Sequence, residues 1–237
     1  MLDRLERSFR ETERFTADAA HELRTPLAVI RNEAEVALRR ARSGEEYGRV
    51  LENVLEETIR LSRMADELLF LCRQDAGLNP RRGEPVDLAP LLDEVVGNMR
   101  PVAQEKGVSL TLDQPVVGTV AGDTRQFRRV FYNLIDNAVK YTPAEGRVRV
   151  DCRRDDGEVV VSVSDTGGGI PEEHLPRVFD RFYRADPSRT GDGNGAGLGL
   201  SICQSVVQAV GGSISVESTV GNGTTFRVRL PAGSDGE

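Results

Sequence analysis

Apolar positions in the first third of the chain recur at helical spacing. Leu, Ala, Glu and Arg dominate up to Ala76, where Pro26 is the only proline, and Arg42-Ser43-Gly44 is the one break in the pattern. We therefore predict two long helices joined by a tight turn. The apolar positions on these helices are Leu2, Leu5 and Phe9, followed by Leu51, Val54, Leu55, Leu61, Met64, Leu68 and Leu71.

Each predicted helix carries a single apolar stripe, which a two-helix hairpin cannot bury by itself. Dimerisation into a four-helix bundle would bury both stripes, and we expect this arrangement for residues 1–76. A helical linker or a coiled-coil spacer would show the same periodicity. The pattern alone leaves that alternative open.

The pattern changes after residues 77–84, whose Gly, Pro and Asn content predicts a linker. Strands and helices are mixed over residues 85–231. The expected strands are 86–88, 108–112, 117–121, 147–152, 159–164, 213–217 and 225–230, and the expected helices are 89–106, 124–141 and 198–210. This mixture predicts an α+β or α/β sandwich with one layer of helices on one sheet, followed by a disordered tail over 232–237.

Composition and charge exclude several classes of protein. The 38 acidic side chains outnumber the 31 basic ones, giving a net charge of -7, whereas a nucleic-acid binder needs a basic face. The longest apolar runs fall well short of the ~18 residues of a membrane span, and the charged start is unlike a signal peptide. Cys72, Cys152 and Cys203 are odd in number and far apart, which predicts reduced thiols in a cytoplasmic domain.

A glycine-rich loop is the first candidate for chemistry. Residues 191–199 read GDGNGAGLG, and a predicted helix follows directly. Glycines allow backbone N–H groups to approach an anion, and the positive helix end adds to the attraction. The loop lacks the Gly-Lys-Ser/Thr of a P-loop, and no strand leads straight into it as in a dinucleotide fingerprint. A flexible loop without a ligand is the alternative.

Three further segments fit a nucleotide. Asn133 and Asn137 are four residues apart on one helix face, where two amide oxygens can hold a hydrated Mg²⁺, and Lys140 on nearly the same side could meet a phosphate. Asp165 ends an apolar strand and could accept a hydrogen bond from the adenine amine. The segment GNGTTF over 221–226 opens the last strand. Each segment alone could be a polar helix face or a turn, but their combination predicts an ATP site.

In this order the segments NLIDNAVKYT, DTGGGI, FDRFYR, GNGAGLGLSI and GNGTTF resemble the N, G1, F, G2 and G3 boxes of sensor histidine kinases. The resemblance implies a Bergerat-type α/β sandwich, as in gyrase, Hsp90 and MutL ATPases, that binds ATP and Mg²⁺. The implied ATP-binding residues are Asn133, Asn137, Lys140, Tyr141, Asp165, Gly167, Gly169, Arg184, Gly195, Gly197, Leu198 and Gly199, with Asn137 as the metal ligand.

The resemblance also implies individual roles. Asn133 would support Asn137, Lys140 and Arg184 would lie near the phosphates, and Tyr141 would lie beside the nucleotide. A mobile lid would span roughly residues 185–196. Two phenylalanines, Phe179 and Phe182, would pack at its base or would belong to the core.

The chain has two histidines. His21 lies in FTADAAHELRTPL, which resembles the H box and implies that His21 is the phosphoacceptor. Glu22 could accept Nδ1–H and so leave Nε2 to attack a phosphoryl group. Thr25, one turn on, would orient a water that dephosphorylates the partner, and Pro26 could kink the helix. We predict that His174 is an exposed first-turn residue without chemistry.

The implied function is Mg-ATP-dependent autophosphorylation of His21, followed by transfer to an aspartate of a response regulator, with phosphatase activity towards that partner. A homodimer is expected. The first twenty residues resemble the exit from a HAMP-type linker, which implies the cytoplasmic part of an inner-membrane sensor. The alternatives are an ATPase clamp of the same fold and a phosphatase-biased scaffold. Asn133 stands where clamp ATPases place a glutamate base, which disfavours the clamp.

Overall fold

The computed structural model describes residues 2–39, 43–76, 83–113, 118–185 and 196–233, with side chains from residue 13 onward. The chain divides into two compact units, residues 1–73 and 74–237. None of the described helices combines the length and the apolar content that crossing a bilayer requires.

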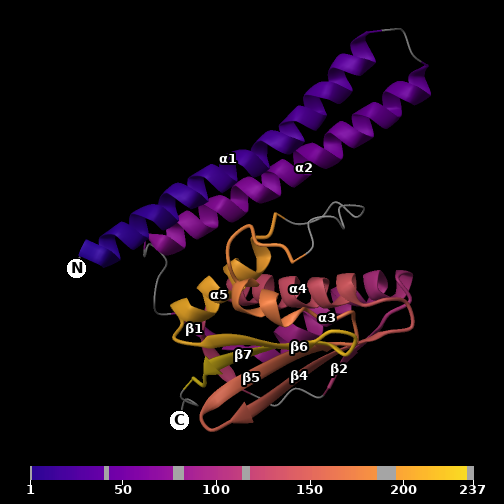
Figure 1. The fold of residues 1–237 in the computed structure, drawn as a ribbon. Coiled ribbons are helices and arrows are strands. Elements are labelled where there is room, and N and C mark those ends of the chain that lie inside the picture. The colour runs from indigo at the N-terminus through magenta and orange to yellow at the C-terminus, as the bar shows by residue number, and fades with distance from the viewer. Residues whose placement is uncertain (1, 40–42, 77–82, 114–117, 186–195, 234–237) are drawn as a thin grey trace. The chain divides into compact units, whose positions relative to one another are not determined.

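The first unit is a hairpin of two long helices, α1 (Leu2–Leu38) and α2 (Gly44–Asp75), which run side by side (Figure 1). Helix α1 continues through Pro26, whose side chain is buried, so the proline does not end the helix. Besides Pro26, the apolar side chains buried among the described residues of the hairpin are Ala37, Met64 and Leu71. Many others remain exposed: Leu27, Val29, Val36, Leu38, Tyr47, Leu51, Leu55, Ile59 and Leu69.

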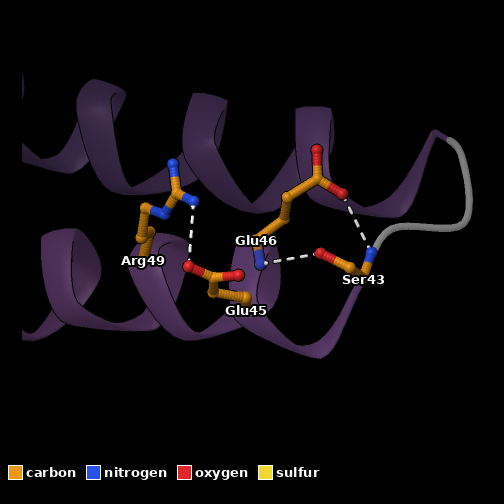
Figure 2. A network of polar contacts seen from close by, with 4 residues as sticks. All are labelled: Ser43, Glu45, Glu46 and Arg49. Atoms are coloured by element: carbon orange, nitrogen blue, oxygen red, sulfur yellow. Dashed lines mark hydrogen bonds and ion pairs between the residues drawn. The ribbon is translucent and has the colours of Figure 1, made fainter.

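Helix α2 begins with a capping box (Figure 2). The hydroxyl of Ser43 accepts from the Glu46 N–H at 3.2 Å, and the Glu46 carboxylate accepts from the Ser43 N–H at 2.9 Å. Arg49 pairs with Glu45 one turn on, at 3.4 Å. Reciprocal bonding of this kind satisfies two N–H groups that a helix start leaves unpaired. Two residues of the predicted turn, Ser43 and Gly44, therefore belong to the start of α2, while residues 40–42 lie outside the described part.

The second unit is an α/β sandwich. Its elements are β1 (Glu84–Asp87), α3 (Leu88–Glu105), β2 (Ser109–Leu112), β3 (Thr119–Gly122), α4 (Thr124–Tyr141), β4 (Arg147–Asp155), β5 (Glu158–Asp165), η1 (Glu172–Arg177), α5 (Gly199–Ala209), β6 (Ser213–Thr219) and β7 (Gly223–Pro231). The main sheet has the order β2-β4-β5-β7-β6, in which β2 and β4 are parallel and the other pairs antiparallel. Strands β1 and β3 form a separate antiparallel ribbon. The long helices α3, α4 and α5 lie on one face of the sheet (Figure 1), which confirms the predicted single layer of helices.

The core lies between this helix layer and the sheet. Strand register places Val150 opposite Val163 and Val163 opposite Phe226, so one face of three strands is apolar. On β4 and β7 these side chains alternate with exposed or half-buried polar ones, whereas β5, at the centre of the sheet, is buried continuously from Val159 to Val163. Helix α4 contributes a continuous buried stripe of Phe127, Val130, Phe131, Leu134, Ile135, Ala138 and Val139. The packing fixes the helix at a rotation that leaves Asn133 and Asn137 half-buried.

Most element boundaries agree with the sequence, and the differences have a physical cause. Helix α4 spans the predicted residues, whereas strands β4 and β5 extend to a tight turn at residues 155–158 because the ladder continues to its end. The chain remains bound beyond β7: Ala232 bridges Val120, and the Gly233 N–H donates to the Thr119 carbonyl at 2.7 Å. The first two residues of the predicted disordered tail are therefore paired.

Candidate functional site

Helix α4 and the start of α5 meet at an amide side chain. Asn133 Nδ2 donates to the Gly199 carbonyl at 3.3 Å, and a Cβ on Gly199 would lie 3.5 Å from that nitrogen. Gly199 is the first residue of α5, whose N-terminal N–H groups carry the positive end of the helix dipole. The structure thus joins two of the predicted segments and places an anion-attracting helix end beside the amide face of α4.

The residues on this face fit a Mg²⁺ that is bound partly by the protein and partly by the phosphates of a nucleotide. Among the described residues, no cluster of three His, Cys, Asp or Glu could hold a metal. Asn133 uses its NH₂ group for Gly199, which leaves its amide oxygen as an acceptor. Asn137 lies one turn further along the same half-buried face. A few neutral oxygens of this kind suit Mg²⁺, which keeps several waters and binds substrate phosphates.

The C-terminal end of α4 is held by Lys106, the C-cap residue of α3. Lys106 Nζ donates to the Val139 carbonyl at 3.0 Å and also to the Lys140 carbonyl. A cation at a helix C-terminus is favourable because it meets the negative end of the dipole. Lys140 Nζ lies 5.7 Å from the centroid of the Tyr141 ring, so these two predicted site residues are adjacent. Burial raises the pKa of Asp136, and the charges of Lys140 and Lys106 act against this rise.

Asp165 ends β5 with one carboxylate oxygen engaged. Oδ1 accepts from the Gly167 N–H at 2.8 Å and from the Thr224 N–H at 3.2 Å. Within the described part of the chain these are its recorded hydrogen bonds, so Oδ2 is the oxygen that remains for an external donor. Burial raises the pKa of Asp165, while the two backbone N–H bonds lower it. The carboxylate is therefore oriented by the backbone and poised to accept from an amine.

Two glycines allow the loop after β5 to pack closely. A Cβ on Gly167 would lie 2.5 Å from the Tyr141 carbonyl oxygen, and a Cβ on Gly169 would lie 2.2 Å from the Thr219 carbonyl oxygen. Gly169 also has φ of 71°, which L-residues rarely adopt. Both positions require glycine, so the loop can contact the end of α4 on one side and the end of β6 on the other.

Ser218 ties this loop to β7 and was not identified from the sequence. Its hydroxyl donates to the Gly223 carbonyl at 2.8 Å and accepts from the Ile170 N–H at 2.8 Å. Thr224 Oγ1 lies 2.9 Å from the same oxygen. Because Thr224 also donates its N–H to Asp165, the network positions the carboxylate. The sequence offered only the GNGTTF segment as a signal for this arrangement.

Gly197 and Leu198, two more of the predicted site residues, lie at the start of α5. The Phe182 N–H donates to the Gly197 carbonyl at 2.9 Å, Leu198 is fully buried, and Phe179 meets Phe226 edge-on at 6.2 Å. Arg184 is exposed and has no recorded contact with the other predicted site residues that are described. Gly195 and nearly all of the predicted lid over 185–196 lie outside the described residues.

His21 is exposed on α1 in the first unit. The Thr25 hydroxyl donates to the His21 carbonyl at 3.5 Å. Within the described residues, no hydrogen bond joins Glu22 to the His21 ring, because adjacent positions on a helix point in different directions. An open hollow along this face of α1 is lined by His21, Arg24, Thr25, Ala28, Val29 and Asn32. The imidazole is therefore accessible to a reactant.

Known proteins share both units. A family model described as the His Kinase A (phospho-acceptor) domain matches residues 11–77. A second, described as the histidine kinase-, DNA gyrase B- and HSP90-like ATPase, matches residues 122–234. The chain is 43% identical to the probable sensor protein PcoS of Escherichia coli over 230 residues, which are 97% of this chain and 49% of that protein. It thus spans about half the length of that relative.

Solved structures give the same result. The chain is similar to the mycobacterial sensor histidine kinase MprB, with 32% identity and a TM-score of 0.54 over 63% of this chain and 97% of that one. It is also similar to full-length ShkA in complex with AMPPNP, with 31% identity and a TM-score of 0.70 over 95% of this chain and 47% of that one. The fold and site define an ATPase unit that follows a phospho-acceptor hairpin. The chain belongs to the sensor histidine kinase family.

Proposed function

We propose that this chain is the catalytic core of an ATP-dependent protein-histidine kinase that phosphorylates His21. One observation carries the proposal: a single chain combines an accessible His21 in a phospho-acceptor domain with an ATPase unit in which Asn133 is bound to the start of α5. The phospho-acceptor domain supplies the histidine that accepts the phosphoryl group, and the ATPase unit supplies the site for ATP, the phosphoryl donor. We assign the hairpin to residues 1–76, the linker to 77–84 and the ATP-binding unit to 85–231.

In the nucleotide site, Asp165 Oδ2 accepts from the exocyclic amine of adenine. The positive end of α5, Lys140 and Arg184 neutralise the phosphates, and Tyr141 lies beside the nucleotide. Gly195, Gly197, Leu198 and Gly199 border the phosphates. Asn137, supported by Asn133, binds Mg²⁺, which supplies further charge neutralisation when the nucleotide is bound.

The transfer forms a bond between His21 Nε2 and the γ-phosphorus and breaks the bond from that phosphorus to the bridging oxygen, so ADP leaves. Glu22 accepts Nδ1–H after a side-chain rotation, which leaves the lone pair on Nε2. No proton then has to leave the attacking nitrogen. In-line positioning and charge neutralisation supply most of the rate.

The P–N bond of phosphohistidine is labile, which suits onward transfer to an aspartate in the receiver domain of a response regulator. In the separate phosphatase reaction, Thr25 orients a water that attacks the aspartyl phosphate of that partner, so that inorganic phosphate leaves and the aspartate is restored. The exposed apolar side chains of α1 and α2 support a homodimer, because a second hairpin would cover them. We place this core on the cytoplasmic side of an inner-membrane sensor.

The direct test is incubation with Mg²⁺ and γ-labelled ATP, comparing wild type with His21→Gln. Label on wild type should be stable to base and labile to acid, and His21→Gln should carry none while still binding nucleotide. Arg31→Gln, an exposed change on the same helix, is the matched control and should keep the label. Label that persists in His21→Gln would overturn the assignment.

The same experiment separates the alternatives. Steady phosphate release without labelled protein would indicate the clamp-type ATPase. Bound nucleotide with neither label nor release would indicate a phosphatase-biased scaffold. Asn133 has no useful basicity for activating water, so we expect slow release.

A further inference from the structure

We propose that His174 is a positioning residue for nucleotide binding: through Tyr183 it holds the backbone where Phe182 meets Gly197, at the entrance to α5. The inference rests on the proposed ATP site and adds to it a side chain that does not touch the nucleotide. His174 is not the exposed first-turn residue that the sequence suggested, because its side chain is only 26% exposed.

Two residues of η1 hold the Tyr183 ring. His174 Nδ1 lies 2.6 Å from the Tyr183 hydroxyl, a short hydrogen bond. The Arg177 guanidinium lies 4.3 Å from the centroid of the same ring, within the range of a cation–π contact. The hydroxyl and the face of the ring are thus held from the same short helix. Glu173 lies on the other side of the imidazole, 3.7 Å from Nε2.

The residue before Tyr183 has an unfavourable backbone conformation. Phe182 has φ of 61°, a left-handed value that is unfavourable for a residue with a side chain. Such a conformation persists only where the surroundings hold it in place. The Phe182 N–H is bound to the Gly197 carbonyl at 2.9 Å on one side, and Tyr183 is clamped to η1 on the other. The two attachments together determine the turn.

This turn sets the start of α5. Gly197 has φ of 71°, and a Cβ there would lie 2.7 Å from the Phe182 carbonyl carbon, so the two backbones are in close contact. Leu198 follows, and its carbonyl accepts from the Ile202 N–H at 3.0 Å and the Ser201 hydroxyl at 2.8 Å. Gly199 then meets Asn133. The contacts run from His174 to the helix end that attracts phosphate.

The position of this path makes the expected effect selective. The path ends at the phosphate side of the proposed site, while Asp165 is held separately by the N–H groups of Gly167 and Thr224. Ser218 in turn contacts the Thr224 hydroxyl. Loss of the His174–Tyr183 bond should therefore weaken binding of the phosphates and leave adenine recognition in place. A purely structural role would lower stability and weaken all nucleotides alike.

The test uses calorimetry on the full chain with Mg²⁺ and two probes, a non-hydrolysable ATP analogue and AMP. Tyr183→Phe removes only the hydroxyl and keeps the ring beneath Arg177. His174→Leu removes the ring nitrogen, and His174→Asn keeps a polar atom near the position of Nδ1. Glu172→Gln, an exposed change at the start of the same short helix, is the control.

We expect Tyr183→Phe and His174→Leu each to raise the Kd of the triphosphate by about 2- to 10-fold, the range of one hydrogen bond. The double variant should add little to either single change. His174→Asn should recover most of the affinity, and the AMP affinity and the melting temperature should stay close to wild type. Glu172→Gln should match wild type for both probes.

Equal losses for the triphosphate and AMP, or additive effects of the two changes, would overturn the inference. So would unchanged triphosphate affinity in both single variants. Failure of the proposed function is a separate outcome, since wild type itself would then not bind the triphosphate.

Discussion

The two units solve the problem of burying apolar surface in different ways. In the hairpin, Leu51 and Leu55 on α2 remain 67% and 59% exposed, whereas in the α/β unit Leu134 and Ile135 on α4 are fully buried. The hairpin has one partner helix for each stripe, and the α/β unit closes its helices over a five-stranded sheet. The unit proposed to supply the acceptor is therefore incomplete alone, while the unit proposed to bind ATP is complete. This difference predicts that changes in one unit leave the other intact.

The largest expected effect is loss of the proposed dimer. Leu51→Ser combined with Leu55→Ser should convert the protein to monomers. Burying each leucine contributes about 1.5–3 kcal/mol to association, and both hairpins of the dimer lose this contribution. Sedimentation measures the oligomeric state, and nucleotide affinity should stay unchanged. Glu52→Gln with Glu56→Gln, on the neighbouring exposed positions, is the control. A dimer that survives the serine changes would contradict the account of the hairpin.

The next effect concerns the closed unit. Leu134→Ala should lower the free energy of unfolding of the α/β unit by about 2–5 kcal/mol, since it leaves a cavity where a fully buried side chain of α4 packs. Scanning calorimetry should show an earlier transition for this unit and an unshifted one for the hairpin. Glu105→Gln, an exposed change on α3, should shift neither. Parallel destabilisation of both units would mean that they fold as one.

Asp165→Asn should separate binding from stability. Asn Oδ1 can still accept from Gly167 and Thr224, but its NH₂ group would face the adenine amine, so nucleotide affinity should fall by about 10- to 100-fold. Because burial raises the pKa of Asp165, its ionised form is disfavoured in the folded state. Ionisation of Asp165 therefore lowers the stability of the folded wild-type protein as the pH rises through this raised pKa. The variant should therefore melt at or above the wild-type temperature at neutral pH.

The same carboxylate gives a pH dependence. Wild-type affinity for the nucleotide should decrease as the pH falls towards the raised pKa of Asp165, because protonation removes the acceptor. The Asn variant should not show this component. Binding titrations across the acidic range measure both profiles, and identical profiles would place the titration elsewhere.

The smallest effect is in the capping box. Ser43→Ala should destabilise the hairpin by about 1 kcal/mol, because the Glu46 N–H loses its acceptor. Thermal unfolding followed by circular dichroism measures the shift, and Ser43→Thr should restore most of the loss. An equal loss in the Thr variant would argue against the cap.

The sequence predicted what local patterning controls. Helix α4 begins and ends as expected because its apolar stripe is regular and Asp123 caps its start by accepting from Arg125 and Gln126. The capping box is also readable as Ser43-x-x-Glu46, but the break in helical periodicity there indicates only a turn. Contacts between distant segments were not readable. Lys106 at the end of α4, Ser218 between two loops and Tyr183 on His174 all depend on how the elements pack together.

One measurement tests most directly whether the hairpin supplies the phosphoacceptor and the α/β unit binds ATP. In it, bound nucleotide and labelled protein are quantified together for wild type, His21→Gln and Asp165→Asn. We predict that wild type binds nucleotide and becomes labelled at His21. His21→Gln should bind nucleotide without label, and Asp165→Asn should show reduced binding and reduced label at nucleotide concentrations near the wild-type Kd. Label on His21→Gln, or undiminished nucleotide binding by Asp165→Asn, would contradict the account.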